Sequence, residues 1–143
     1  MAEPNGNPHR YDLRIYYEDT DAGGIVYYAN YLAYAERARA EMLRELGVES
    51  SRLMRDNNVV LAVRWCSVDY LRSAVLDDHL VIETSLQRLG GATLEVTQIV
   101  RREDVDLVRI DLKLGCVSLC GGAARLPLAV REKLGGHLNS NRS

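Results

Sequence analysis

Residues 30–47 read NYLAYAERARAEMLRELG, and this stretch decides the fold. Its apolar positions recur at the spacing of one helical face: Tyr31, Ala35, Ala38, Met42 and Leu46. Gly47 follows the last of them, where a left-handed cap commonly ends a helix. The stretch therefore predicts a helix of about five turns. Its many alanines give it a slim body, which lets its backbone come close to a curved sheet.

Strand-like sequence surrounds this helix. One β-prone run, residues 11–17, precedes it, and four follow it over residues 59–71, 80–89, 92–102 and 105–119. The last run alternates most clearly: apolar residues at 108, 110, 112, 114 and 116 are separated by Arg109, Asp111 and Lys113. A short helix is predicted over residues 128–135.

The order of elements predicts the fold class. A strand, a long helix and four strands joined by short turns, without a repeating βαβ pattern, favour α+β with a five-stranded antiparallel sheet. One helix covers only one face of such a sheet, so we expect a homodimer or homotetramer. Residues 11–134 are predicted to form a single domain, between polar, flexible ends at 1–10 and 135–143.

Composition narrows the functional class. The chain has 143 residues, of which 47% are hydrophobic and 27% charged, with a formal net charge of -2. This composition is globular and lacks the basic excess of nucleic-acid binders. No signal peptide or membrane span is evident, so a cytoplasmic protein without an integral membrane segment is expected. Three cysteines without a C-x-x-C pair favour reduced thiols.

Several common sites are missing from the sequence. It contains no G-x-S-x-G, Walker-type or G-x-G-x-x-G motif and no H-E-x-x-H, so hydrolase triads, nucleotide loops and zinc proteolysis lack their signatures. The stretch DTDAGG imitates a calcium loop, but it has Gly23 at the fifth position and Asn30 at the twelfth, where ligands are required. We expect no metal and no cofactor.

The chain just before the helix is the candidate site. Residues 16–31, YYEDTDAGGIVYYANY, hold three carboxylates, two glycines and five tyrosines. Free N–H groups at the helix start favour negative charge, and Gly23 and Gly24 leave a ligand room to reach them. A carboxylate such as Asp21 could attack a carbonyl there or deprotonate a water. Alternatively, Asp19 or Asp21 only caps the helix or shapes a turn.

The stretch YYEDTDAGGIVYYANYLAYAERARAEMLRELG resembles the signature of the 4-hydroxybenzoyl-CoA thioesterase-like family, most closely its branch of bacterial Tol-Pal-associated acyl-CoA thioesterases. The specific part is Y-E-D-T-D-A-G-G-I-V-Y, then A-N-Y, then E-R-A-R-x-E-M-L-R, at uninterrupted spacing. A looser similarity extends over about residues 11–120. The resemblance implies a hot dog fold, in which the sheet wraps the long helix and two subunits share a pair of sites.

The resemblance also implies an activity, the hydrolysis of acyl-CoA to a free acid and coenzyme A. It places the catalytic carboxylate on Asp21, and it places the amide that polarises the thioester carbonyl near Tyr28. The sequence departs from the closer branch at Tyr28, where many members carry histidine and the founding, aromatic-substrate branch carries tyrosine.

Further residues are predicted to contact substrate. The glycines, two apolar residues and two tyrosines belong to the loop and helix start, and two arginines near strand ends suit the phosphates of coenzyme A. This set is Gly23, Gly24, Ile25, Val26, Tyr27, Tyr31, Arg72 and Arg88. The alternatives are ordinary core positions for the tyrosines and solvated surface for the arginines.

Two other functions stay open at this point. Hot dog scaffolds also host acyl-CoA dehydratases or hydratases, although these generally use a histidine near the helix start, and this sequence has none there. A non-catalytic acyl-CoA-binding protein is the second alternative.

Overall fold

The computed structural model of the chain describes residues 8–138. The strands in this part are β1 (His9–Arg14), β2 (Val59–Tyr70), β3 (His79–Leu89), β4 (Thr93–Arg102) and β5 (Val105–Ser118). The helices are α1 (Asn30–Glu45), α2 (Ser50–Arg52) and α3 (Leu128–Gly135). A 3₁₀ turn, η1 (Tyr17–Asp19), precedes α1, and a π-helical turn, η2 (Leu53–Asn57), follows α2.

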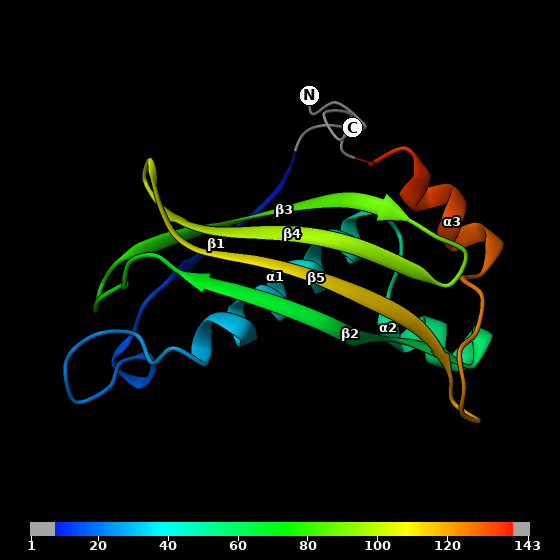
Figure 1. The fold of residues 1–143 in the computed structure, drawn as a ribbon, viewed down its shortest axis with the longest axis horizontal. Coiled ribbons are helices and arrows are strands. Elements are labelled where there is room, and N and C mark those ends of the chain that lie inside the picture. Colours follow the sequence, from blue (N-terminus) through cyan, green and yellow to red (C-terminus); the bar gives the residue numbers. More distant parts are fainter. Residues whose placement is uncertain (1–7, 139–143) are drawn as a thin grey trace.

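The five strands form one sheet in the order β1-β3-β4-β5-β2, and every neighbouring pair is antiparallel. Helix α1 lies across one face of the sheet and contacts β1, β3 and β4 (Figure 1). The predicted α+β class, with a long helix against a five-stranded antiparallel sheet, is confirmed. Because α1 lies toward the β1 side, most of the edge strand β2 is exposed.

Helix α1 ends as the sequence predicts. Gly47 has φ +86°, and its N–H donates to the carbonyl of Arg44 at 3.0 Å. The N–H of Val48 donates to the carbonyl of Leu43 at 2.7 Å. These two bonds form a Schellman motif, in which a glycine in the left-handed region turns the chain away from the helix.

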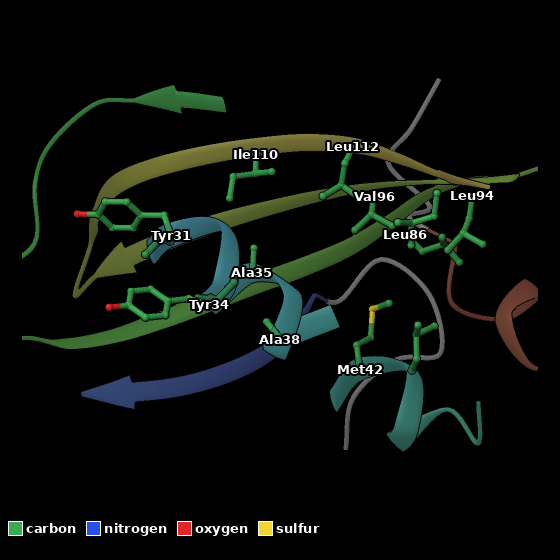
Figure 2. Close-up of a cluster of buried hydrophobic side chains, with 14 of the residues drawn as sticks. Tyr31, Tyr34, Ala35, Ala38, Met42, Leu86, Leu94, Val96, Ile110 and Leu112 are labelled. Atoms are coloured by element: carbon green, nitrogen blue, oxygen red, sulfur yellow. The ribbon is translucent and has the colours of Figure 1, made fainter. Parts of the chain in front are cut away.

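The core lies between α1 and the sheet. Ala35 and Ala38 are fully buried, and they lie among side chains of the sheet such as Ile110 and Leu112 (Figure 2). The alternating residues of β5 from Val108 to Cys116 are buried on this face, as predicted. Small side chains at the contact allow the helix backbone to approach the strands closely.

A buried polar side chain ties the helix to the sheet. The Gln98 amide of β4 is fully buried and donates from Nε2 to the carbonyl of Ala35 at 2.8 Å and to the Thr84 hydroxyl at 3.0 Å. Its Oε1 accepts a hydrogen bond from Arg39 at 3.1 Å. A buried amide is stable only when it is paired, so these bonds select one position of α1 along the sheet.

The structure differs from the sequence prediction at the edges of elements. Strand β1 ends at Arg14 rather than at residue 17, because the Asp19 carboxylate accepts the N–H of Tyr16 at 2.8 Å and bends the chain into η1. The helical residues 50–57 were not predicted.

The structure describes the inner part of each end that the sequence predicts to be flexible, and both parts contain residues paired with the sheet. Strand β1 begins at His9, inside the range 1–10, and Leu138 bridges to Leu86 of β3, inside the range 135–143. Residues 1–7 and 139–143 lie outside the described residues.

Three further findings bear on function. All three cysteines are free thiols, as expected. No helix between residues 8 and 138 is both long and apolar enough to span a membrane. Over the same range, no three metal-binding side chains gather into a possible ion site.

The close approach of α1 predicts the effect of a larger side chain. Ala38→Leu should lower the free energy of unfolding by about 1–3 kcal/mol, because the added methyl groups overpack the contact with the sheet. Urea unfolding at a fixed protein concentration measures this change. Ala33→Leu, on the exposed side of the same helix, should stay within about 0.5 kcal/mol of the parent. Equal costs for the two variants would contradict the close packing.

Candidate active site

Residues 20–26 of the candidate site fold into a tight turn, the acidic turn, between η1 and α1. Thr20 and Val26 form an antiparallel bridge, and the N–H of Asp21 donates to the carbonyl of Ile25 at 2.8 Å. The N–H of Gly24 donates back to the carbonyl of Asp21 at 3.0 Å. Gly24 has φ +83°, a conformation that glycine adopts at little cost, so the turn requires a glycine here.

Asp21 stands exposed at the tip of this turn. Its Oδ1 accepts the N–H of Gly23 at 2.8 Å, whereas its Oδ2 accepts no hydrogen bond from the described residues. A Cβ at position 23 would lie 3.2 Å from Oδ1, so a side chain there would crowd the carboxylate. Gly24 thus allows the backbone to turn, and Gly23 leaves room beside the Asp21 carboxylate.

Hydrogen bonds join the turn to the segment that follows β2. The N–H of Val26 donates to the carbonyl of Ala74 at 2.9 Å, and Ile25 bridges to Val75. The N–H of Ala74 donates in turn to the hydroxyl of Tyr31, also at 2.9 Å. Ala74 and Tyr31 are both buried, so this chain of bonds fixes the turn against the first turn of α1.

The start of α1 carries free donors. The helix has no side-chain cap, because the methyl group of Ala29 cannot accept a hydrogen bond. The Asn30 amide donates to the carbonyl of Asp19 at 2.9 Å. Among the described residues, nothing accepts the N–H groups of Tyr28 and Ala29. The helix dipole adds positive potential at this end, so the two amides favour an anionic or polarised oxygen.

A cavity of about 300 Å³ lies beside these groups. Its wall contains one carboxylate together with apolar, aromatic and basic side chains. The lining residues are Asp21, Ile25, Val26, Tyr27, Tyr28, Tyr31, Tyr70, Leu71, Arg72 and Ser73.

Most of the residues predicted to form the site line this cavity: Asp21, Ile25, Val26, Tyr27, Tyr28, Tyr31 and Arg72. Gly23 and Gly24 form the adjoining turn. Arg88 is not brought to it. It lies near the end of β3 on the α3 side of the molecule, nine residues beyond His79, which is roughly 30 Å along a strand (Figure 1).

The sequence prediction missed Tyr70, Leu71 and Ser73. They lie at the end of β2 and just after it, some 40 residues beyond the turn in sequence. No local pattern marks them. Tertiary contacts bring this segment to the cavity: Ile25 pairs with Val75, and Ala74 bonds to Val26 and Tyr31.

The tyrosines in the cavity wall do not share one environment. Tyr31 is 2% exposed, whereas Tyr27 and Tyr28 are 47% and 60% exposed. Of these three tyrosines, Tyr31 alone occupies a core position. Burial raises the pKa of Tyr31, partly offset by the N–H donated from Ala74, and burial also raises the pKa of Tyr70. Interaction with Tyr28 raises the pKa of Tyr27. These three hydroxyls therefore stay protonated at neutral pH and act as hydrogen-bonding groups. Among the residues that line the cavity, Asp21 is the carboxylate.

The comparison with protein families gives one clear result. A family model described as the thioesterase superfamily matches residues 23–109. The chain belongs to the thioesterase superfamily. The matched range begins two residues after Asp21 and includes the glycine pair, the start of α1 and the segment after β2. The predicted family and its hot dog fold are confirmed.

Relatives of known name agree with this result. The acyl-CoA thioesterase YbgC of Haemophilus influenzae is 40% identical over 113 residues, which cover 79% of this chain and 83% of the relative. The acyl-CoA thioester hydrolase YbgC of Escherichia coli O157:H7 is 44% identical over 109 residues, covering 76% and 81%. Among solved structures, a probable thioesterase from Bartonella henselae has a TM-score of 0.81 at 32% identity, over 84% of this chain and 99% of that one.

The left-handed backbone at Gly24 predicts the cost of a side chain there. Gly24→Ala should lower the free energy of unfolding by about 1–2 kcal/mol, because a Cβ disfavours this conformation even though no atom lies within 4 Å of it. Urea unfolding measures the change. Gly135→Ala is the matched control: this glycine lies in α3 outside the left-handed region, so alanine should be neutral or stabilising. A neutral Gly24→Ala would show that the turn does not require the positive φ.

Proposed function

We propose that this protein is an acyl-CoA thioesterase that hydrolyses its substrate to a free acid and coenzyme A. Asp21 and the amides at the start of α1 are its two catalytic elements. The observation that carries this proposal is that Asp21 and Tyr28 both line one cavity. The relatives named acyl-CoA thioesterases support the reaction and the substrate class.

The amides supply the electrophilic half of the reaction. When the thioester carbon is attacked, its carbonyl oxygen takes on negative charge. The N–H groups of Tyr28 and Ala29 have no other acceptor among the described residues and are available to that oxygen. Loss of one such donor typically costs about 2.7–4 kcal/mol of transition-state stabilisation.

Asp21 supplies the other half in one of two ways. As a nucleophile, its free Oδ2 bonds to the carbonyl carbon, the C–S bond breaks with its electron pair on sulfur, and water then hydrolyses the mixed anhydride. As a general base, it takes a proton from water while the water oxygen bonds to the carbonyl carbon. The C–S bond then breaks, and the proton passes to the coenzyme A thiolate.

The cavity suits the reacting end of the substrate. Its volume is at the small end of ligand pockets, which run from about 300 to 1,000 Å³. Ile25, Val26 and Leu71 provide apolar wall for the acyl group, and Arg72 lies at the same cavity with a charge suited to a coenzyme A phosphate.

The proposed active form is a homodimer or homotetramer with shared sites. Strand β2 is an edge strand, and Val63 and Trp65 in its middle are 50% and 56% exposed. Beside it, a groove of about 450 Å³ runs between β2 and α1, with Leu43, Leu61 and Leu114 in its wall. An unpaired, apolar edge of this kind is normally covered, and a second copy of the chain is the proposed cover.

A charge in this groove tests the proposed oligomer. Val63→Asp should shift the mass measured by sedimentation equilibrium from a multiple of the chain mass to that of a single chain, because association would take the new carboxylate out of water. Leu128→Asp is the control, since Leu128 is 71% exposed on α3, and it should leave the mass unchanged. A wild-type protein that sediments as a single chain would overturn this part of the proposal.

Asp21→Asn tests the catalytic assignment. Thiol release from acyl-CoA should fall at least about a hundredfold, because the amide is neither a base nor a nucleophile of comparable strength. Asparagine keeps an oxygen for the Gly23 N–H, so the turn and the binding of acyl-CoA should persist. Thiol release over a panel of short, long and aromatic acyl-CoAs, with binding measured by calorimetry, provides both readouts.

Asp104→Asn is the matched control, because this exposed carboxylate lies in the β4–β5 turn and lines no part of the cavity. It should retain full turnover. Undiminished turnover in Asp21→Asn would refute the role of Asp21. Hydration of a 2-enoyl thioester without thiol release by the wild type would instead identify a hydratase, and tight binding without either reaction would identify a binding protein.

A further inference from the structure

Tyr70, the last residue of β2, contacts the helix start through its hydroxyl. This hydroxyl donates a hydrogen bond to the carbonyl of Tyr28 at 3.2 Å. Among the described residues, that carbonyl accepts no other hydrogen bond. The contact joins two segments separated by 42 positions in sequence.

The planarity of the peptide bond links this contact to the catalytic donors. The carbonyl of Tyr28 and the N–H of Ala29 belong to one trans peptide group, so they point in opposite directions, and fixing one fixes the other. The preceding peptide group, which carries the N–H of Tyr28, is held in the same way, since its Tyr27 carbonyl accepts the N–H of Asn30 at 2.9 Å. Each free N–H thus belongs to a peptide group whose carbonyl is held by a hydrogen bond. Asn30 holds the group that carries the Tyr28 N–H, and Tyr70 holds the group that carries the Ala29 N–H.

The ring of Tyr70 is itself held in place. Its centroid lies 6.1 Å from that of Tyr28, edge to face, and 5.9 Å from that of Tyr31. Tyr31 is buried and bonded to Ala74, so it provides a fixed wall. Because burial raises the pKa of Tyr70, its hydroxyl keeps the proton that it donates.

We propose that Tyr70 is a positioning residue, which sets the direction of the amide donors at Tyr28 and Ala29 toward the thioester carbonyl. Its hydrogen bond also polarises the Tyr28–Ala29 peptide group, which makes the Ala29 N–H a better donor. This inference rests on the proposed thioesterase function. It assigns a role in that reaction to a residue of the edge strand, which acts through the Tyr28–Ala29 peptide group.

Tyr70→Phe tests the proposal, because it removes only the hydroxyl and keeps the ring contacts with Tyr28 and Tyr31. We expect kcat to fall about three- to tenfold, the effect of one neutral hydrogen bond, while KM changes less than about twofold. Tyr11→Phe is the control: Tyr11 lies in β1, away from the cavity, and its removal of a hydroxyl should change neither constant. An unchanged kcat, or a loss confined to KM, would overturn the proposal.

A spectroscopic measurement separates positioning from a general loss of structure. Bound to Asp21→Asn protein, a ¹³C-labelled acyl-CoA should show a carbonyl stretch at lower frequency than in water, because the amide donors polarise the bond. Adding Tyr70→Phe should return the stretch toward its solution value with urea unfolding unchanged. An identical stretch in the single and double variants would refute the role of Tyr70. A wild-type protein that releases no thiol from any acyl-CoA of the panel would refute the proposed function instead.

Discussion

The close approach of α1 to the sheet is the constraint on which the rest of the structure depends. Ala35 and Ala38 allow that approach because they add little bulk at the contact. Apolar contact alone would still permit the helix to slide, but Gln98 bonds to the carbonyl of Ala35 and to the hydroxyl of Thr84 in the same buried space. Because an unpaired amide there is costly, one longitudinal position of α1 is favoured. The place of the helix start relative to the sheet follows from it.

The candidate site is built outward from that helix start. Tyr31, in the first turn, accepts a hydrogen bond from Ala74, and Ala74 accepts one from Val26 at the end of the acidic turn. This series of bonds places Asp21 and Tyr28 in the wall of one cavity, although the Asp21 carboxylate itself is exposed and accepts a single hydrogen bond among the described residues. The chemistry of the turn therefore depends on packing several residues away. A family of enzymes can vary the acyl pocket without changing this frame.

Local patterns in the sequence predict much of this protein and fail where tertiary contacts decide. Helical spacing, strand alternation and Gly47 predict α1, β2 to β5 and the Schellman cap, because each is set by near neighbours. The end of β1 was misplaced because the Asp19 carboxylate competes for the backbone at Tyr16. Tyr70 was missed because only tertiary contacts, 42 positions apart in sequence, bring it to Tyr28. Arg88, grouped with Arg72 as a strand-end arginine, lies next to the last residue of β3, and that end of β3 is on the α3 side of the molecule (Figure 1). The roles of Asp21 and Tyr28 stay predictions.

The cavity also explains how a thioesterase site can work without a histidine in its wall. The cavity-lining tyrosines Tyr27, Tyr31 and Tyr70 have raised pKa values, through contact with Tyr28 in the first and burial in the other two, so they are poor bases near neutral pH. In the proposed mechanism, proton transfer or nucleophilic attack is left to Asp21, which is the only carboxylate among the lining residues. In the same proposal the amides stabilise charge, and the Tyr70 hydroxyl holds the peptide group that carries the Ala29 amide. Because the donors are backbone groups, the exchange of histidine for tyrosine at position 28 leaves this arrangement intact.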